Sequence, residues 1–347
     1  MKRIYIPLLI FYLVTFAKAQ NHTQIHDFTF KGVKLNGVLN LPENTVPKGI
    51  VLLVHGSGRT NAVAQNWYAD VRNTLVKTGY AAFMWDKMGC GKSGGTFNYN
   101  QKVQNSALEV IAAIHYLKAK EIPGAETIGL WGISRAGWIN PIVINIYKDI
   151  KFWISVSGVD AKENFNYLFE ENLKINKVPQ DSIQLLLHEL KEGVRITHSG
   201  GSFETYMKAT KNLRNNAFLQ RFNNNNIITK EGYYDYQKNF MKEKLDKESG
   251  LQVYVPGFKE LLSGIKCPVL ALFGEQDKNV DWQKTKNLYQ ETLGKNKNLT
   301  IQSFAACNHN LYRCKTGGFY EFEDDKLPWN RCEGFLEVME DWLNGLE

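Results

Sequence analysis

The sequence lacks a strong excess of charge, an internal repeat and, beyond its first 20 residues, any segment that could cross a membrane. Lysine and arginine exceed aspartate and glutamate by seven, and three of these cations, Lys2, Arg3 and Lys18, lie near the N-terminus. The remaining excess of four is too small and too dispersed to indicate a nucleic-acid partner. No cysteine spacing has a zinc signature, and neither a metal nor another cofactor is expected.

The first 19 residues have the three parts of a secretory signal peptide. The basic start "MKR" is followed by the apolar stretch "IYIPLLIFYLVTF" and by the small-residue site "AKA". This arrangement predicts cleavage after Ala19 and export to the periplasm or the extracellular space. The alternative is an uncleaved membrane anchor, but the apolar run is shorter than the ~20 residues that span a bilayer. After cleavage no stable membrane span is expected.

Cysteine is scarce, and all five cysteines lie beyond the expected cleavage site. An oxidising compartment permits disulfides, but an odd number leaves at least one cysteine free or paired with another chain. Cys314 and Cys332 flank the loop-like stretch "KTGGFYEFEDDKLPWNR", and we expect these two to be bridged. Cys267 opens the run "CPVLALF" and is expected in a buried strand, whereas Cys90 lies in a glycine-rich turn.

The sequence does contain enough apolar material for a large core, because 44% of its residues are hydrophobic and 12% are aromatic. Short β-rich runs alternate with longer amphipathic ones, a pattern typical of an α/β fold with a mostly parallel, doubly wound sheet. An opening hairpin is expected around Gly32. Further strands are expected at residues 49–58, 80–86, 127–132, 151–158, 267–274 and 298–304.

The alternation stops between about Asp160 and Phe258, where the runs become helical and charged. A segment of this length inside a sheet protein needs packing of its own, so we expect an inserted helical cap rather than a loop. The expected organisation is a signal peptide at 1–19, the first part of the core at 20–159, the cap at 160–258 and the second part of the core at 259–347.

The stretch "IGLWGISRAGW" places Ser134 where a strand-like run gives way to a helix-like one. A serine on such a sharp turn is lifted clear of its own backbone, at the edge of the sheet where open α/β folds bind ligands. Gly132 leaves room for the turn, and the amide of Arg135 would point to a developing oxyanion. The simpler interpretation is that Ser134 only caps the helix.

A serine nucleophile needs a base, and the base needs an acid that orients it. Of the seven histidines, His309 in "AACNHNLY" directly follows the last expected strand and precedes the last helix, which places it at the same edge. Asp277 in "GEQDKNV" follows the preceding strand and is the expected acid, with Asp160 in reserve. Asp281 is better suited to cap the next helix. His55 ends an earlier strand and is assigned to an oxyanion loop.

The order Ser, Asp, His along the chain resembles that of the α/β-hydrolases, as do "HGSG" after a strand, "GISRAG" at the turn, and "GEQD" before "NHN". From about His26 onward the chain is similar to bacterial capped carboxylesterases and serine aminopeptidase-like hydrolases. The segment "DKMGCGKSGG" resembles the D-x-x-G-x-G-x-S turn of this group, so Ser93 is expected to be a turn residue. Ala136 stands where the serine turn usually has its second glycine.

The resemblance implies roles for individual residues. Ser134 would be the nucleophile, Asp277 the acid and His309 the base. The oxyanion hole would combine the amide of Arg135 with that of Ser57, or with that of Gly58 in its place.

These features predict an exported enzyme that hydrolyses carboxylic esters of small to medium size through an acyl-enzyme, with a small-molecule ester as its partner. The same residues could serve an aminopeptidase-like hydrolase of amides, in which Glu170 and Glu171 could anchor a charged terminus, or a thioesterase. A non-catalytic binding module is disfavoured because the serine, the histidine and the oxyanion glycines are retained.

We expect the cap to lie across the strand ends and to select the substrate. Most of its aromatic side chains should form its own core, and a few should face the nucleophile. The candidates are Phe165, Tyr167, Phe169, Tyr206 and Tyr234.

Overall fold

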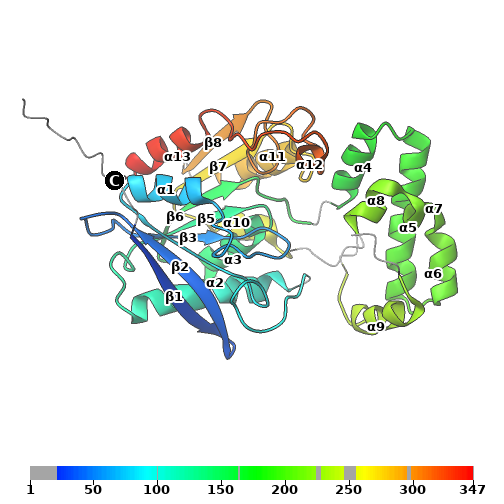
Figure 1. The fold of residues 1–347 in the computed structure, drawn as a ribbon, viewed down its shortest axis with the longest axis horizontal. Helices are drawn as coiled ribbons and strands as arrows, with labels where there is room; N and C mark the ends of the chain where they lie inside the picture. Colours follow the sequence, from blue (N-terminus) through cyan, green and yellow to red (C-terminus); the bar gives the residue numbers. More distant parts are fainter. Residues whose placement is uncertain are drawn as a thin grey trace, which may run out of the picture.

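The structure is a computed structural model that describes residues 22–99, 101–162, 165–223, 228–245, 255–294 and 298–346. The expected signal peptide at 1–19 lies outside this part of the chain. The described residues form one sheet of eight strands in the order β1-β2-β4-β3-β5-β6-β7-β8 (Figure 1). The strands are β1 (His22–Phe30), β2 (Val33–Leu41), β3 (Ile50–Val54), β4 (Ala81–Trp85), β5 (Ile128–Ile133), β6 (Ile150–Val156), β7 (Val269–Gly274) and β8 (Leu299–Phe304).

The sheet is mostly parallel, which confirms the α/β fold expected from the sequence. Strands β3 to β8 pair in parallel, whereas β1 pairs antiparallel with β2, and β2 pairs antiparallel with β4. The expected opening hairpin is present: Lys31 and Gly32 join β1 to β2, and both have a positive φ. Two successive positive φ values suit the right-handed twist of the strands on either side.

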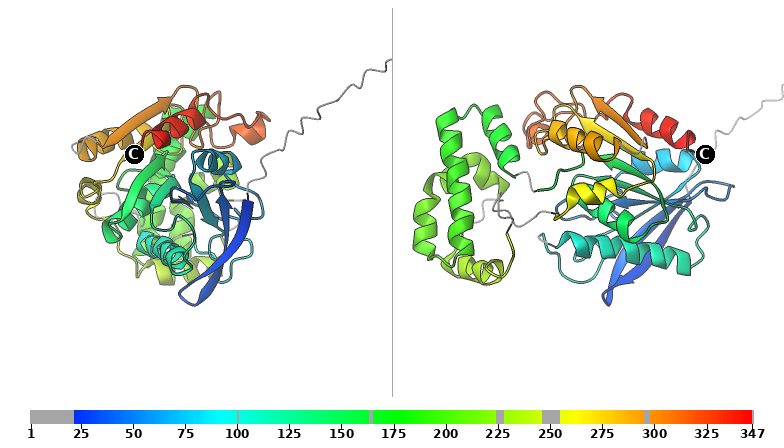
Figure 2. Two further views of the ribbon diagram at one scale, coloured as in Figure 1. Left: turned by 90° about the vertical axis from the view of Figure 1, so that its left-hand side faces the viewer. Right: turned by 180° about the vertical axis from the view of Figure 1, so that it is seen from behind.

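Helices cover both faces of the sheet, because the central strands are apolar on both sides. Along β3, for example, Leu52 and Leu53 are fully buried in two different clusters. One face is covered by α1 (Ala69–Lys77) and α13 (Phe335–Asn344). The other is covered by α2 (Val103–Ala119), α3 (Ala136–Ile146), α10 (Phe258–Ser263) and α11 (Trp282–Thr292), and Figure 2 shows both layers.

Between β6 and α10, the described residues include six helices, α4–α9, which form a helical insertion with apolar clusters of its own. It comprises α4 (Phe165–Ile175), α5 (Gln180–His198), α6 (Phe203–Ala209), α7 (Lys211–Asn215), α8 (Ala217–Phe222) and α9 (Lys230–Phe240). Leu168, Phe169 and Leu219 are buried in one cluster, and Leu173, Ile183 and Leu186 in another. Figure 1 shows the insertion beside the sheet, on the right of the view. None of the helices in the described part of the chain has the length and apolarity that crossing a membrane requires.

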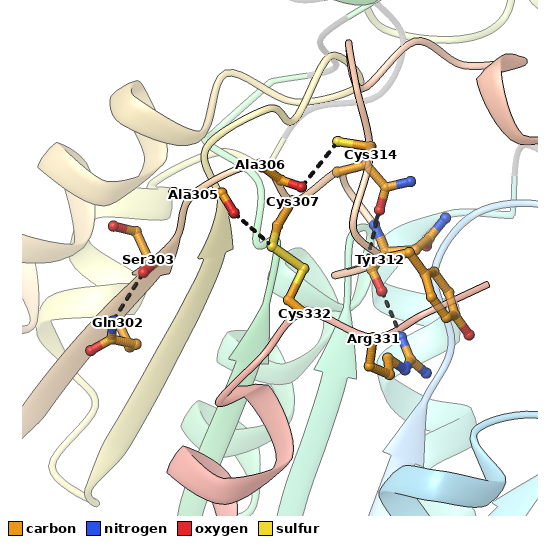
Figure 3. Close-up of a disulfide and its surroundings, with 11 residues drawn as sticks. Gln302, Ser303, Ala305, Ala306, Cys307, Tyr312, Cys314, Arg331 and Cys332 are labelled. Carbon is orange, nitrogen blue, oxygen red and sulfur yellow. Dashed lines mark hydrogen bonds between the residues drawn. A yellow bond between two sulfur atoms is a disulfide. The ribbon is translucent and has the colours of Figure 1, made fainter. Parts of the chain in front are cut away.

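The disulfide joins Cys307 to Cys332, so the expected pairing of Cys314 with Cys332 is wrong (Figure 3). An antiparallel bridge between Tyr312 and Arg331 brings the two segments together, and Cys332 N–H donates a hydrogen bond to the carbonyl oxygen of Leu311. This register places Cys332 against Cys307, in the turn that follows β8, at a Cα–Cα distance of 6.1 Å.

The cysteines outside this bridge, among the described residues, are Cys90, Cys267 and Cys314. The Cys314 thiol donates to the carbonyl oxygen of Ala306 at 3.5 Å, and burial raises its pKa to about 12, which keeps it protonated and unreactive. Cys267 lies just before β7 and is only partly buried, which corrects the expectation of a buried strand position.

The pairing can be tested by peptide mapping of the unreduced protein, which should contain a peptide linked through Cys307 and Cys332. Because this bridge closes a separation of 25 residues, the Cys332→Ser variant should lose ~3 kcal/mol of the free energy of unfolding. Cys314→Ser is the control and should unfold at nearly the wild-type denaturant concentration. A peptide linked through Cys314 would contradict the pairing.

Candidate active site

Ser134 stands in a strained turn between β5 and α3. Its φ is 56°, in the left-handed region that side chains other than glycine rarely adopt. Its N–H donates to the carbonyl oxygen of Val156 at 3.0 Å, and its own carbonyl oxygen accepts from Gly137 N–H at 2.7 Å. A Cβ at Gly132 would lie 2.6 Å from the Cβ of Ala136, so both positions need small residues. This is the sharp strand-to-helix turn that the sequence predicted.

His309 and Asp277 lie together at the same edge of the sheet. His309 Nδ1 and Asp277 Oδ2 are 2.7 Å apart, and both side chains are buried. The other carboxylate oxygen, Oδ1, accepts from the amides of Asn279 at 2.8 Å and Val280 at 2.9 Å. The carboxylate is thus fixed by its own loop and holds one nitrogen of the ring, which leaves Nε2 as the atom that can exchange a proton with a nucleophile.

The reserve acid, Asp160, is engaged elsewhere. Its Oδ2 lies 2.6 Å from Lys284 Nζ, and Oδ1 accepts from the amide of Lys162 at 3.1 Å. Asp281 caps α11 as expected, because Oδ1 accepts from Lys284 N–H at 3.0 Å. Of the candidate acids, the structure brings Asp277 to His309.

The loop after β3 lies against the serine turn. A Cβ at Gly56 would come within 3.2 Å of the Cβ of Ser134, so a larger residue would press on the serine. Ser57, Gly58 and Arg135, the expected sources of the oxyanion hole, line the same cavity as Ser134 and His309. Among the described residues, none accepts a hydrogen bond from the Ser57 amide.

His55 and Ser93 have structural partners. His55 Nε2 lies 2.7 Å from the carbonyl oxygen of Trp85, and burial together with the nearby Lys87 ammonium lowers the pKa of the ring to about 3. The imidazole is therefore neutral and donates to that carbonyl. Ser93 Oγ donates to the carbonyl oxygen of Asp86 at 2.6 Å and accepts from the amide of Asn36 at 2.8 Å, as a turn residue would.

A cavity of about 1370 Å³ lies above Ser134 and His309, between the core and the helical insertion. Eleven aromatic side chains line it, and no carboxylate does among the described residues. Of the five candidates from the insertion, Phe165 and Tyr206 are part of this wall. Phe169 is buried in the insertion's own cluster, and the Tyr234 side chain is exposed.

Most of the aromatic wall was not anticipated from the sequence. Its other members are Trp67, Tyr68, Tyr99, Trp138, Phe222, Tyr233, Tyr236, Phe319 and Tyr320. Trp138 had a local signal, because it stands at the end of the serine motif. The others come from loops and helices far apart in the sequence, and no spacing connects them.

The helical insertion also contacts the loop that carries Asp277. Tyr167 Oη donates to the backbone carbonyl oxygen of Asp277 at 3.0 Å, and Lys278 Nζ lies 2.9 Å from Glu171 Oε2. Glu170 pairs with Lys174 at 2.8 Å. Both glutamates that could have anchored a charged terminus are therefore paired with lysines, and neither lines the cavity.

Solved structures with a similar fold include esterases and a peptidase. Esterase Pf2001 from Pyrococcus furiosus aligns with 93% of this chain and 92% of its own, at a TM-score of 0.54 and 14% identity. Proline iminopeptidase from Mycobacterium smegmatis aligns with 93% of this chain and 98% of its own, at a TM-score of 0.52 and 15% identity. At such identities the similarity shows the fold alone.

Sequence comparisons narrow the relationship. Thiohydrolase aneE from Aspergillus aculeatus is 25% identical over 118 residues, which are 34% of this chain and 36% of that protein. The chain thus matches about a third of the length of this curated relative. The model of the family described as serine aminopeptidase, S33, matches residues 45–313, which is most of the sequence. The chain therefore belongs to the serine aminopeptidase S33 family, within the α/β-hydrolase superfamily.

Proposed function

We propose that this protein is an exported serine hydrolase that cleaves carboxylic esters of small to medium size through an acyl-enzyme. The observation that carries the proposal is the hydrogen bond of 2.7 Å between His309 and the buried Asp277, beside a cavity that is lined by His309 and by Ser134 on its strained turn. Nucleophile, base and acid of one reaction would thus lie at one edge of the sheet, in the order typical of α/β-hydrolases.

In the proposed reaction, Ser134 Oγ attacks the ester carbonyl carbon and its proton passes to Nε2 of His309. The carbonyl oxygen becomes negative and accepts hydrogen bonds from the amides of Ser57 and Arg135, each worth ~3 kcal/mol of transition-state stabilisation. The imidazolium, held by Asp277, then gives its proton to the departing alcohol. Water attacks the acyl-enzyme by the same route and regenerates the serine.

The residues of the cavity wall favour an ester as the substrate over a peptide with a free amino terminus. Its eleven aromatic side chains offer apolar surface to an acyl or alcohol group. A substrate with a free α-ammonium group would need a carboxylate nearby, and the candidates Glu170 and Glu171 are paired with lysines outside the wall. Aminopeptidase-like activity, which the family's description suggests, and thioester hydrolysis, which the aneE relative suggests, remain the alternatives with the same site residues.

The helical insertion would act as the cap, over residues 160–258, and limit the size of the substrate. The cavity exceeds the ~300–1,000 Å³ of ordinary ligand pockets, so its volume alone does not limit acyl length. Because the insertion covers the cavity, we expect folded polypeptides to be excluded from it. The disulfide at Cys307 and Cys332 supports export, because such bonds persist in oxidising compartments.

The covalent step can be tested with an organophosphonate probe on the mature protein. The probe should label the wild type, and Ser134→Ala should abolish both labelling and ester turnover because no other residue would supply the nucleophile. The thermal unfolding temperature of the variant should stay within a few degrees of the wild type. Labelling that survives the substitution would refute the assignment of Ser134.

The identity of the acid can be tested with two matched variants. Asp277→Asn should lower kcat by about three to four orders of magnitude, because the amide cannot hold the ring in the productive tautomer. Asp160→Asn removes a carboxylate that pairs with Lys284 and should leave kcat within about threefold of wild type. The reverse pattern would assign the acid to Asp160. Ester turnover under substrate saturation is the measurement.

Substrate selection can be tested with p-nitrophenyl esters from acetyl to palmitoyl, run beside an aminoacyl-p-nitroanilide and a thioester. We expect kcat/KM to peak at short to medium acyl chains, because a covered and largely apolar pocket orients a compact ester through a limited number of contacts. Phe165→Ala and Tyr206→Ala should shift this profile because both side chains line the cavity. Tyr234→Ala is the control, since its ring is exposed and outside the wall. A peak at palmitoyl, or preferred turnover of the anilide, would contradict the proposed substrate class.

A further inference from the structure

The turn that follows β4 supports the loop that would carry the oxyanion amide. The support turn spans residues 86–93, and the oxyanion loop spans residues 55–61. Arg59 donates from its guanidinium to the carbonyl oxygen of Gly89 at 2.7 Å, and Gly91 N–H donates to Asn61 Oδ1 at 2.7 Å. The two segments are about 30 residues apart in the sequence and are joined by several hydrogen bonds.

Lys87 makes the central contacts of the support turn. Its Nζ donates to the carbonyl oxygen of Gly56 at 2.5 Å and to that of Gly58 at 2.8 Å. Ser57, the expected oxyanion donor, stands between these two glycines. One ammonium group therefore holds the backbone on both sides of the residue whose amide would contact the reacting oxygen.

The contact of Lys87 with the Gly56 carbonyl also restricts the orientation of the Ser57 amide, because both groups belong to one peptide unit. The Gly56 carbonyl and the Ser57 N–H belong to one planar peptide unit, and no peptide bond among the described residues is cis. In a trans unit the two groups point in opposite directions. Fixing the Gly56 oxygen on Lys87 thus fixes the Ser57 N–H on the other side, while Gly56 itself lies against Ser134.

We propose that Lys87 is a positioning residue for the oxyanion hole: its ammonium group orients and polarises the Gly56–Ser57 peptide so that the Ser57 amide donates to the transition state. The inference rests on the proposed function, and it gives Lys87 a role in addition to those of the serine, the histidine and the aspartate. Its effect should be on kcat rather than on KM, because the oxyanion exists only in the transition state.

Charged and titratable groups from several elements face Lys87. Arg135 lies at the start of α3, Glu109 on α2, His55 after β3, and Cys90 in the support turn. Burial and, next, the Arg135 guanidinium lower the pKa of Lys87 to about 8, against opposing effects of Glu109 and Cys90. As the pH rises through this value, the ammonium group loses the charge that polarises the peptide.

Loss of the Lys87 proton should affect stability and activity in opposite directions: as the pH rises, kcat should fall, whereas the contribution of Lys87 to the free energy of unfolding should rise. The unfolded lysine keeps its proton up to pH ~10.4, whereas the folded one releases it near pH 8. Between these values the unfolded state binds more protons, so the contribution of Lys87 to the free energy of unfolding rises with pH. If Lys87 had only a structural role, kcat would not fall over the pH range in which its contribution to the free energy of unfolding rises.

The test compares Lys87→Met with Lys92→Met, which removes the same charge from an exposed position in the same turn. With a p-nitrophenyl ester, Lys87→Met should lower kcat about 10- to 100-fold with KM within about threefold, since one oxyanion donor is worth ~10²–10³ in kcat. Lys92→Met should keep the wild-type kcat. Lys87→Arg, which retains a charged donor, should recover part of the loss.

The dependence of kcat on pH provides a second test, which does not require a variant that loses the contact between residue 87 and the oxyanion loop. Wild-type kcat should fall above about pH 8, and Lys87→Arg should lack this alkaline limb because a guanidinium stays charged. An identical limb in both proteins, or equal kcat for Lys87→Met and Lys92→Met, would overturn the inference. If Lys87→Met does not fold by circular dichroism, the comparison of wild type with Lys87→Arg decides.

Failure of the proposed function gives a different result. In that case the wild type itself would neither hydrolyse the esters nor bind the organophosphonate at Ser134. A wild type that is labelled and active, together with an unaffected Lys87→Met, would refute only the role of Lys87.

Discussion

The left-handed backbone at Ser134 is the constraint on which the rest of the site depends. Such a conformation costs ~1–2 kcal/mol for a residue with a side chain. The turn persists because its neighbours determine it: its amide is bonded to Val156, its carbonyl to Gly137, and Gly132 packs so closely on Ala136 that neither position could carry a larger side chain. Strain of this kind is typical of functional positions, where the surrounding structure holds one residue in a single orientation.

The loops after β7 and β8 carry Asp277 and His309, and His309 lines the same cavity as Ser134. Each loop is fixed by contacts of its own. Two backbone amides hold the Asp277 carboxylate. The segment of His309 is held by Asn308 Oδ1, which accepts from the amides of Asn310 and Tyr312, and by the disulfide two residues before the histidine. Because each side chain is held by its own loop, the hydrogen bond between them would need little reorganisation in the proposed reaction.

The helical insertion contributes to the site in two ways. Its aromatic side chains form one wall of the cavity, and its first helix, α4, donates from Tyr167 to the backbone of Asp277 and pairs Glu171 with Lys278. A second link lies farther out, where Arg221 of α8 pairs with Glu323 at 2.6 Å and Asp324 at 2.7 Å. The part of the cavity wall that belongs to the insertion is therefore attached to the loop whose Asp277 is hydrogen-bonded to His309.

The sequence by itself determined the α/β fold, the serine turn and the edge of the sheet on which Ser134, Asp277 and His309 lie. These features follow from local patterns, because the carboxyl ends of parallel strands share one edge and residues just after them converge there. The tertiary structure alone decided the disulfide of Cys307, the members of the aromatic wall and the contact of Lys87 with the oxyanion loop. Each of these depends on the register of segments distant in the sequence, such as the bridge between Tyr312 and Arg331. Local periodicity in the sequence cannot predict that register, because the register is set by the packing of the whole chain.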